Sequence, residues 1–382
     1  MKRMYRRTAP VLALGSLGWL GGCGGDSPPY DELVQRSHIN GIEVVWNPAE
    51  PQRGADDMHL DVEWTAAIDQ TEDPWQMPTA IRASRDRLFI LDAMAGRVYV
   101  LDASTGQASG VIGRPGQGPG ELQRPFGLAV QEAAVVVGNG GRGTLDWFSL
   151  EGEYERSLRI DAVGFALHGV EPDRFLVNSL VGNQGGWSTI DADGGVRSVE
   201  WPDWLHPAQP PRECTRHSTS GALFLRMSCY RPSVQLTDAL GNGVMEVVID
   251  REPVEVSEAQ IQSIVEENAS VMKEDGLPEG LIEEMVRSME EQYRLSRRWR
   301  GIRRDATTGL IALWEQEVDE LGGGPANVHV ISSSGEFLAT FRLEQSWTDF
   351  DFLDGRMHAL VQDGATGLIT LTAYSLDMRT AH

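Results

Sequence analysis

Five charged or titratable side chains lie in four short segments that are far apart in the sequence, and each segment has the pattern of a β-strand. The eight histidines show neither the HxH nor the HExxH spacing of a local metal site. A site could form only where separate strands converge on one axis, and there it could hold Ca²⁺ or Zn²⁺ for hydrolase or lyase chemistry. The alternative, which we favour, is that these side chains line a solvated channel mouth or cap turns. The candidates are Arg82, His168, Arg303, Asp349 and Asp351.

The glycine-rich stretch at residues 113–127, with the sequence GRPGQGPGELQRPFG, invites comparison with a phosphate-binding loop. Such a loop needs a helix directly after it, so that the helix N-terminus can face the anion. Pro119 and Pro125 prevent a useful helix there, and no Gly-Lys-Ser/Thr follows. We therefore exclude a phosphate site and predict a loop that contains neither helix nor ladder strand.

Three tryptophans beside prolines offer a different kind of chemistry. Trp75, Trp201 and Trp204 lie in predicted connectors, where an aromatic face could stack on a sugar or a peptide. Packing between neighbouring sheets is the alternative that we favour.

Composition limits the classes of partner. The chain has 382 residues and a formal net charge of −23, a balance that repels phosphate backbones and argues against nucleic-acid binding. Its 41% hydrophobic content suffices for a substantial core, and 42 glycines with 19 prolines predict many turns.

The first 22 residues have the pattern of a leader. A basic segment at residues 2–7 precedes an apolar run at 9–20, which is too short to span a bilayer, and the sequence LGGC follows. This resembles a bacterial lipoprotein signal peptide. The resemblance implies cleavage before Cys23 and acylation of that cysteine, palmitate included, which would anchor the protein to a membrane. Gly24 in place of aspartate favours the outer membrane. The alternative is an ordinary secretory signal with an incidental cysteine.

The other two cysteines fit an oxidising compartment. Cys214 and Cys229 flank residues 218–221, which have the composition of a hairpin turn, so the two thiols could face each other across paired strands. We predict a disulfide between them. One alternative is a pair of free buried thiols, and a metal site is the weaker one because His217 is the only further ligand nearby.

From residue 59 onward the chain repeats a unit of four short strands. The final unit lacks one strand, whereas residues 59–64 alternate as a half-buried strand and have no unit of their own. A closed ring, in which the early strand completes the last unit, leaves no open sheet edge and allots about 47 residues to each of six units. We therefore predict an all-β, six-bladed β-propeller. Its units are 79–112, 126–160, 164–200, 212–250, 299–343 and 347–376 together with 59–64.

The predicted organisation is a signal peptide at 1–22, a tether at 23–58 and the propeller at 59–382. Within the tether, the short apolar run at 42–46 could form one isolated strand. Helical periodicity at 257–298 predicts a helical hairpin inserted before the fifth blade. The hairpin could pack its apolar stripe on the propeller, or that methionine-rich stripe could act as a lid or a docking surface.

Four segments between residues 87 and 130 resemble NHL-type repeats, and more narrowly the six-bladed β-propeller lipoproteins of bacteria. The resemblance implies a propeller in the cell envelope and transfers little about activity. The segments are RLFILD at 87–92, RVYVLD at 97–102, GRPGQGPGEL at 113–122 and RPFGLAV at 124–130.

The expected function is non-enzymatic recognition of a protein, peptide or glycan at one face of the ring, without a cofactor. It is based on a rigid scaffold with long glycine and proline loops and no local catalytic motif. The alternative is a metal-dependent hydrolase or lyase with its site in the central channel. Apart from the ligand, the expected partner is the membrane, through lipid on Cys23.

Overall fold

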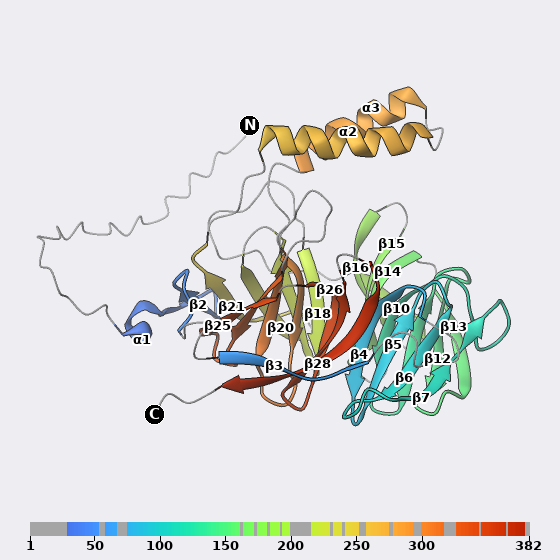
Figure 1. The fold of residues 1–382 in the computed structure, drawn as a ribbon, viewed down its shortest axis with the longest axis horizontal. Coiled ribbons are helices and arrows are strands. Elements are labelled where there is room, and N and C mark those ends of the chain that lie inside the picture. The colour runs from blue at the N-terminus through green and yellow to red at the C-terminus, as the bar shows by residue number, and fades with distance from the viewer. Residues whose placement is uncertain are drawn as a thin grey trace, which may run out of the picture.

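The computed structural model describes the ranges 29–52, 58–66, 75–160, 163–171, 174–181, 184–191, 193–198, 215–229, 232–238, 241–251, 257–274, 278–292, 299–316, 326–343, 345–363 and 366–378. Most of these residues lie in short, mainly antiparallel strands that form six sheets (Figure 1). Each sheet is one blade.

Each of the first three blades is built from four strands that follow one another along the chain. Blade 1 contains β4 (Pro78–Ser84), β5 (Arg87–Asp92), β6 (Arg97–Asp102) and β7 (Ala108–Ile112). Blade 2 contains β10 (Pro125–Val130), β11 (Ala134–Asn139), β12 (Thr144–Ser149) and β13 (Tyr154–Arg159). Blade 3 contains β14 (Val163–Glu171), β15 (Arg174–Val181), β16 (Gln184–Asp191) and β17 (Val196–Ser198).

The remaining blades follow the same order, and the last one borrows a strand from the N-terminal part of the chain. Blade 4 contains β18 (Thr215–Ser220), β19 (Leu223–Ser228), β20 (Ser233–Asp238) and β21 (Gly243–Ile249). Blade 5 contains β22 (Trp299–Arg304), β23 (Ile311–Gln316), β24 (Ala326–Ile331) and β25 (Phe337–Leu343). Blade 6 contains β26 (Ser346–Leu353), β27 (Arg356–Gln362), β28 (Ile369–Met378) and β3 (Met58–Ala66).

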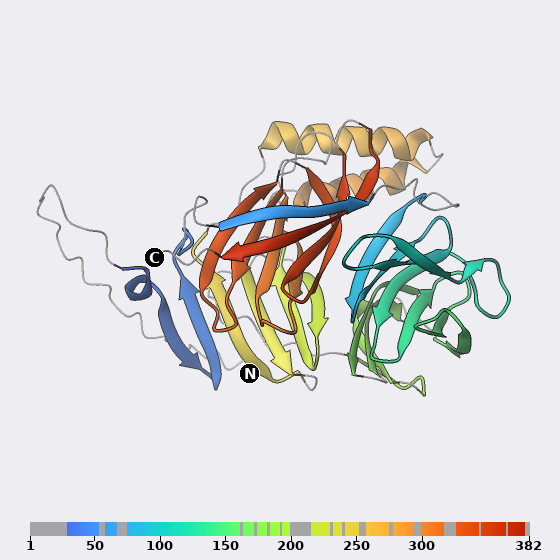
Figure 2. The same cartoon turned by 60° about the horizontal axis from the view of Figure 1, so that its bottom comes forward.

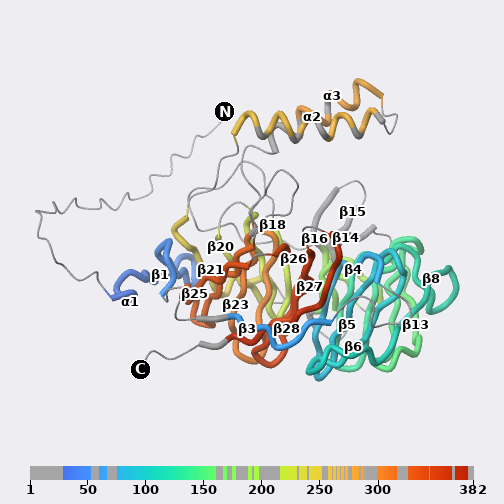
Figure 3. Tube along the Cα trace, viewed as in Figure 1, coloured from blue at the N-terminus to red at the C-terminus, as the bar shows by residue number. Residues whose placement is uncertain are grey.

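The ring is closed by β3. It pairs antiparallel with β28, from Ala66 opposite Leu371 to Met58 opposite Met378, and the two strands lie side by side in Figures 2 and 3. The innermost strands β4, β10, β14, β18, β22 and β26 contact one another in that order, and β26 contacts β4. The prediction of an all-β, six-bladed propeller with four-stranded blades is therefore confirmed.

The wheel is held together by apolar clusters between neighbouring blades. Five such clusters join blades 1 and 2, 2 and 3, 4 and 5, 5 and 6, and 6 and 1. Because a central strand is covered on both faces, its sequence is apolar without interruption instead of alternating. In β5, for example, Leu88, Phe89, Ile90 and Leu91 are all fully buried.

Gly127 allows the innermost strands of blades 2 and 3 to approach closely. A Cβ atom at this position would lie 2.6 Å from the Cβ atom and 2.8 Å from the backbone nitrogen of Leu167. We expect Gly127→Ala to lower the free energy of unfolding by about 1–3 kcal/mol, because the added methyl group overpacks this interface. Urea unfolding measures the loss. The control is Gly280→Ala in α3, where a Cβ atom meets nothing within 4 Å.

The N-terminal segment differs from the prediction. Residues 35–47, which we assigned to a tether, form β1 (Gln35–Ile39) and β2 (Ile42–Asn47) and extend blade 4 to six strands. β2 pairs in parallel with β21, and its residues Val44 and Val45 are fully buried. The prediction missed this because the partner strand lies far along the chain and leaves no local signal. A short helix, α1 (Tyr30–Leu33), precedes β1.

Two helices, α2 (Glu258–Glu274) and α3 (Glu279–Gln292), lie between β21 and β22, within the segment predicted to be a helical hairpin. They contact each other and run side by side above the strands in Figure 1. Ile261 and Val265 of α2 and Ile282 of α3 are buried, whereas Leu281 and Met285 are exposed. No helix among the described residues is long and apolar enough to cross a membrane.

Candidate functional site

The five candidate residues all lie on innermost strands. Arg82 is on β4, His168 on β14, Arg303 on β22, and Asp349 and Asp351 are both on β26. These positions place residues from blades 1, 3, 5 and 6 around the axis of the wheel. Ion pairs join Arg82, Asp349 and Arg303, and His168 interacts electrostatically with both arginines. We call the five candidate residues the channel cluster.

Asp349 is the centre of the channel cluster. Its Oδ2 atom accepts hydrogen bonds from Arg82 Nη1 at 2.9 Å and from the Ile81 backbone N–H at 3.1 Å, and Arg303 Nη2 donates to its Oδ1 atom. All three charged side chains are at most 15% exposed. Both carboxylate oxygens are therefore engaged, and they connect blades 5, 6 and 1.

Asp351 makes a second connection between blades 6 and 1. The Ala83 backbone N–H donates to its Oδ2 atom at 2.9 Å, and the Phe352 N–H donates to its Oδ1 atom at 3.0 Å. Burial raises the pKa of Asp351, and the positive charges of Arg82 and Arg303 oppose this shift. The contacts stabilise the junction at which the ring closes.

His168 of the channel cluster and His217 are two buried histidines on innermost strands, and His217 is close enough to act electrostatically on His168. Burial lowers the pKa of His168 well below its usual value, and the charges of Arg82 and Arg303 lower it further. Burial likewise lowers the pKa of His217 on β18, as do Arg226 and Arg216. His217 could not be assigned to the channel from sequence, because the strands of the fourth unit are the least distinct.

These shifts predict that the protein loses stability in mild acid. A histidine with a lowered folded-state pKa binds its proton more readily in the unfolded chain, so the free energy of unfolding falls as the pH drops below about 6.5. Each such histidine contributes up to about 1.4 kcal/mol per pH unit. We expect His168→Gln to weaken this dependence. Urea unfolding of parent and variant at pH 7 and pH 5 tests it, and equal losses in the two proteins would contradict the assignment.

The channel cluster is arranged for structure more than for metal chemistry. Asp349 already binds two arginines, and Asp351 accepts two backbone N–H groups. Among the residues that the structure describes, no group of three or more histidine, cysteine, aspartate or glutamate side chains is placed to hold a metal ion. The geometry thus gives no ligand set for the hydrolase or lyase alternative within the described ranges.

A groove of about 530 Å³ lies between blades 1 and 2. One wall is the glycine and proline connector from β7 to β10, and the other is the segment before β4 together with the turn between β5 and β6. Two methionines line it, Met77 with 45% and Met94 with 67% of its surface exposed. Pro115 adds exposed apolar surface and Arg124 adds a positive charge, whereas Leu122 and Pro125, which also line the groove, are themselves buried. This site was not predicted from sequence, because its walls come from three separate segments that only the folded chain brings together.

The connector is held rigidly by polar contacts. The buried Asn139 side chain accepts a hydrogen bond from the Gln123 N–H at 2.9 Å and donates to the Glu121 carbonyl at 3.0 Å. Arg142 Nη1 donates to the Gly118 carbonyl at 2.7 Å, and the Gly118 N–H donates to the Glu121 carboxylate at 2.8 Å. The groove wall is therefore fixed before any ligand arrives.

The prediction that this connector contains no ladder strand was wrong in detail. The short strands β8 (Arg114–Pro115) and β9 (Glu121–Leu122) pair in parallel. Pro115 is tolerated because the N–H of the next residue, Gly116, donates to the Leu122 carbonyl at 3.3 Å. Strand β10 follows the connector, so no helix N-terminus faces the glycines.

The remaining predicted residues fall partly outside the described ranges. Cys229 is buried and disulfide-bonded, whereas Cys23 and Cys214 lie outside those ranges. Trp201 and Trp204 also lie outside them. Trp75 is only 5% exposed and belongs to the apolar cluster between blades 6 and 1, as the packing alternative predicted.

Comparisons with known proteins agree with the fold. A family model described as a 6-bladed beta-propeller matches residues 35–176. Among curated proteins, none matches the sequence. A structure of a DUF4221 family member from Bacteroides vulgatus is similar with a TM-score of 0.55 at 10% identity, over 85% of this chain and 99% of that one. A structure of a protein named as exported from Bacteroides fragilis gives 0.54 at 9% identity, over 87% and 99%.

Proposed function

We propose that this chain is an envelope-anchored β-propeller that binds a protein or peptide partner without catalysis. The observation that carries the proposal is the groove between blades 1 and 2, where two exposed methionines face a rigid connector. Flexible thioether side chains adapt to apolar partner residues, and a preformed wall lowers the ordering cost of binding. Met77 and Met94 would be the principal contacts, with Arg124 beside them.

The chemistry of the groove favours a polypeptide over a glycan. Sugar recognition relies on exposed aromatic faces, whereas the groove walls consist of methionine, proline, leucine, alanine and glycine together with glutamine and one arginine. Trp75 is buried and cannot offer such a face from its position. An extended segment with one or two apolar side chains, and an acidic group for Arg124, fits this surface.

Anchoring is proposed from the leader sequence. Residues 1–22 would be removed and Cys23 acylated, which places the wheel at the outer membrane on a lipid anchor. Cys23→Ala tests this step, because the protein would then leave the membrane fraction. Unchanged membrane fractionation of the variant would contradict acylation at this residue.

Photo-crosslinking in the producing bacterium tests the binding proposal. A photoreactive amino acid at position 94 is expected to give a discrete adduct, and Met77→Glu in the same chain should abolish it by placing a charge in the groove. The control position is 368, because Leu368 is similarly exposed on blade 6. Equal labelling at positions 94 and 368, or an adduct that survives Met77→Glu, would overturn the proposal.

A further inference from the structure

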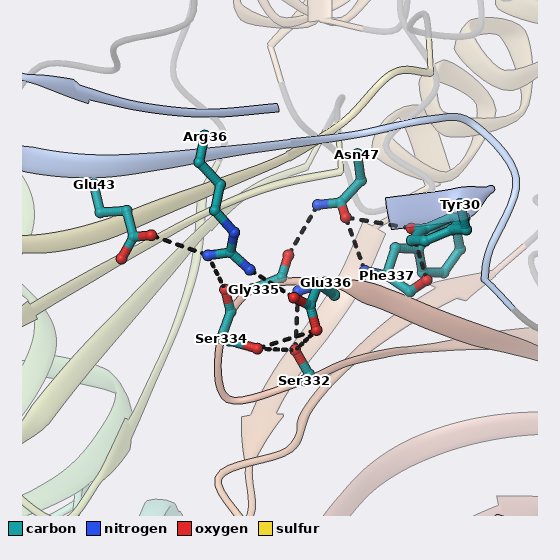
Figure 4. Close-up of polar contacts among 9 residues, drawn as sticks. All are labelled: Tyr30, Arg36, Glu43, Asn47, Ser332, Ser334, Gly335, Glu336 and Phe337. Atoms are coloured by element: carbon teal, nitrogen blue, oxygen red, sulfur yellow. Dashed lines mark hydrogen bonds and ion pairs between the residues drawn. The ribbon is translucent and has the colours of Figure 1, made fainter. Parts of the chain in front are cut away.

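The N-terminal hairpin is fastened to the rim of the wheel between blades 4 and 5 (Figure 4). Asn47, which is 2% exposed, accepts a hydrogen bond from the Phe337 N–H at 2.9 Å and donates to the Gly335 carbonyl at 2.9 Å. A Cβ atom on Gly335 would lie 3.0 Å from Val45 Cγ2. The turn between β24 and β25 thus closes over β2, although β2 itself pairs with blade 4.

Two further side chains hold this segment in place. Arg36 Nη2 contacts Glu336 at 2.7 Å, and its Nη1 atom donates to the Ser334 carbonyl at 2.9 Å. The Tyr30 hydroxyl donates to the Phe337 carbonyl at 2.9 Å, and burial raises the pKa of Tyr30 to about 12. Tyr30 is therefore already attached to blade 5, at the start of α1.

The attachment leaves only a short length of chain before the anchor. Six residues, 24–29, separate Cys23 from Tyr30. Seven Cα–Cα steps span at most about 25 Å when fully extended. A lipid on Cys23 would hold the rim at Tyr30 within that distance of the bilayer surface, whereas a 36-residue tether, as predicted from sequence, would leave the wheel free to tumble.

The groove lies on the opposite side of the wheel. In a ring of six blades, blades 1 and 2 stand across the axis from blades 4 and 5. Figures 1 and 2 show β1 and β2 at the left end of the molecule and blades 1 and 2 at the right end. A lipid anchor attached near β1 and β2 would therefore hold the blade 4–5 end of the wheel near the bilayer, and blades 1 and 2 would lie at the end farthest from the attachment point.

From these contacts we infer that the rim of blades 4 and 5 is the membrane-facing surface and that the groove between blades 1 and 2 lies at the end of the wheel away from the bilayer. The inference rests on the proposed acylation of Cys23. The surface that faces the rim of blades 4 and 5 would be a lipid bilayer, to which the short segment 24–29 connects the wheel. The rim of blades 4 and 5 would face the bilayer, and a partner would reach the groove from the aqueous side.

Energy transfer on vesicles tests this orientation. The full-length acylated protein carries one fluorescent amino acid, either at His38 on β1 or at Met94 in the groove, both of which are exposed. Phosphatidylcholine vesicles contain an acceptor-labelled lipid. We expect at least about twofold more efficient transfer from position 38 than from position 94, because the short segment limits the distance of the rim from the bilayer.

A second variant distinguishes tethering from other causes. About 30 glycine and serine residues inserted between Asp26 and Ser27 should bring the two transfer efficiencies together, because a flexible linker of that length no longer fixes the wheel. Equal transfer from both positions in the short-tethered protein would overturn the orientation while leaving the anchor intact. Failure of the protein to float with the vesicles would overturn acylation, and the orientation with it.

Discussion

Replacing Asp349 with alanine is expected to lower the free energy of unfolding by about 3–5 kcal/mol, the cost of breaking a buried ion pair by removing one partner. Arg82 and Arg303 would remain largely buried without the carboxylate that now binds both. Removing the Asp349 carboxylate also removes the hydrogen bonds that connect blades 5, 6 and 1. Unfolding in guanidinium chloride, followed by tryptophan fluorescence, measures the change.

The matched control is Asp86→Ala, since Asp86 is 82% exposed and its carboxylate lies 3.9 Å from Arg87. An exposed pair of this kind contributes less than about 1 kcal/mol. If the two variants lost the same small amount of stability, the channel cluster would not hold the ring closed as described.

Replacing Cys229 with serine is expected to lower the free energy of unfolding by about 3 kcal/mol, because the disulfide restricts the unfolded chain. Cys229 is fully buried and disulfide-bonded beside β19. The predicted partner is Cys214, so Cys214→Ser should cost the same, and the double variant should cost no more than either single one. Chemical unfolding of all three variants measures the losses. Additive losses, or no loss for Cys214→Ser, would contradict the pairing.

The sequence alone allowed the wheel and its closure to be predicted, because both leave local signals. Strict alternation at residues 59–64 marked a half-buried strand, and the strand missing from the last unit required a partner for it. Arg82, Arg303 and Asp349 could be proposed together because all lie on first strands of repeating units. Their ion pairs could not be predicted, since these depend on the side-chain positions of three blades.

Other features were missed where the partners are distant in the sequence. The apolar run in β2 was visible as a strand, but nothing local identified β21 or the Gly335 turn as its neighbours. The groove was missed for the same reason. Met77 and Met94 form a groove only together with the connector that follows β7, and the sequence does not show that these segments lie side by side. His217 was missed because its blade has the weakest strand pattern.

The most direct test of the account is the affinity of the groove for the partner that position 94 captures, measured by calorimetry. The purified partner should bind the Met77→Glu/Met94→Glu double variant at least about tenfold more weakly than the parent, a loss of about 1.4 kcal/mol or more. The Leu368→Glu control should bind as the parent does. Unchanged affinity in the double variant would show that recognition takes place elsewhere on the wheel.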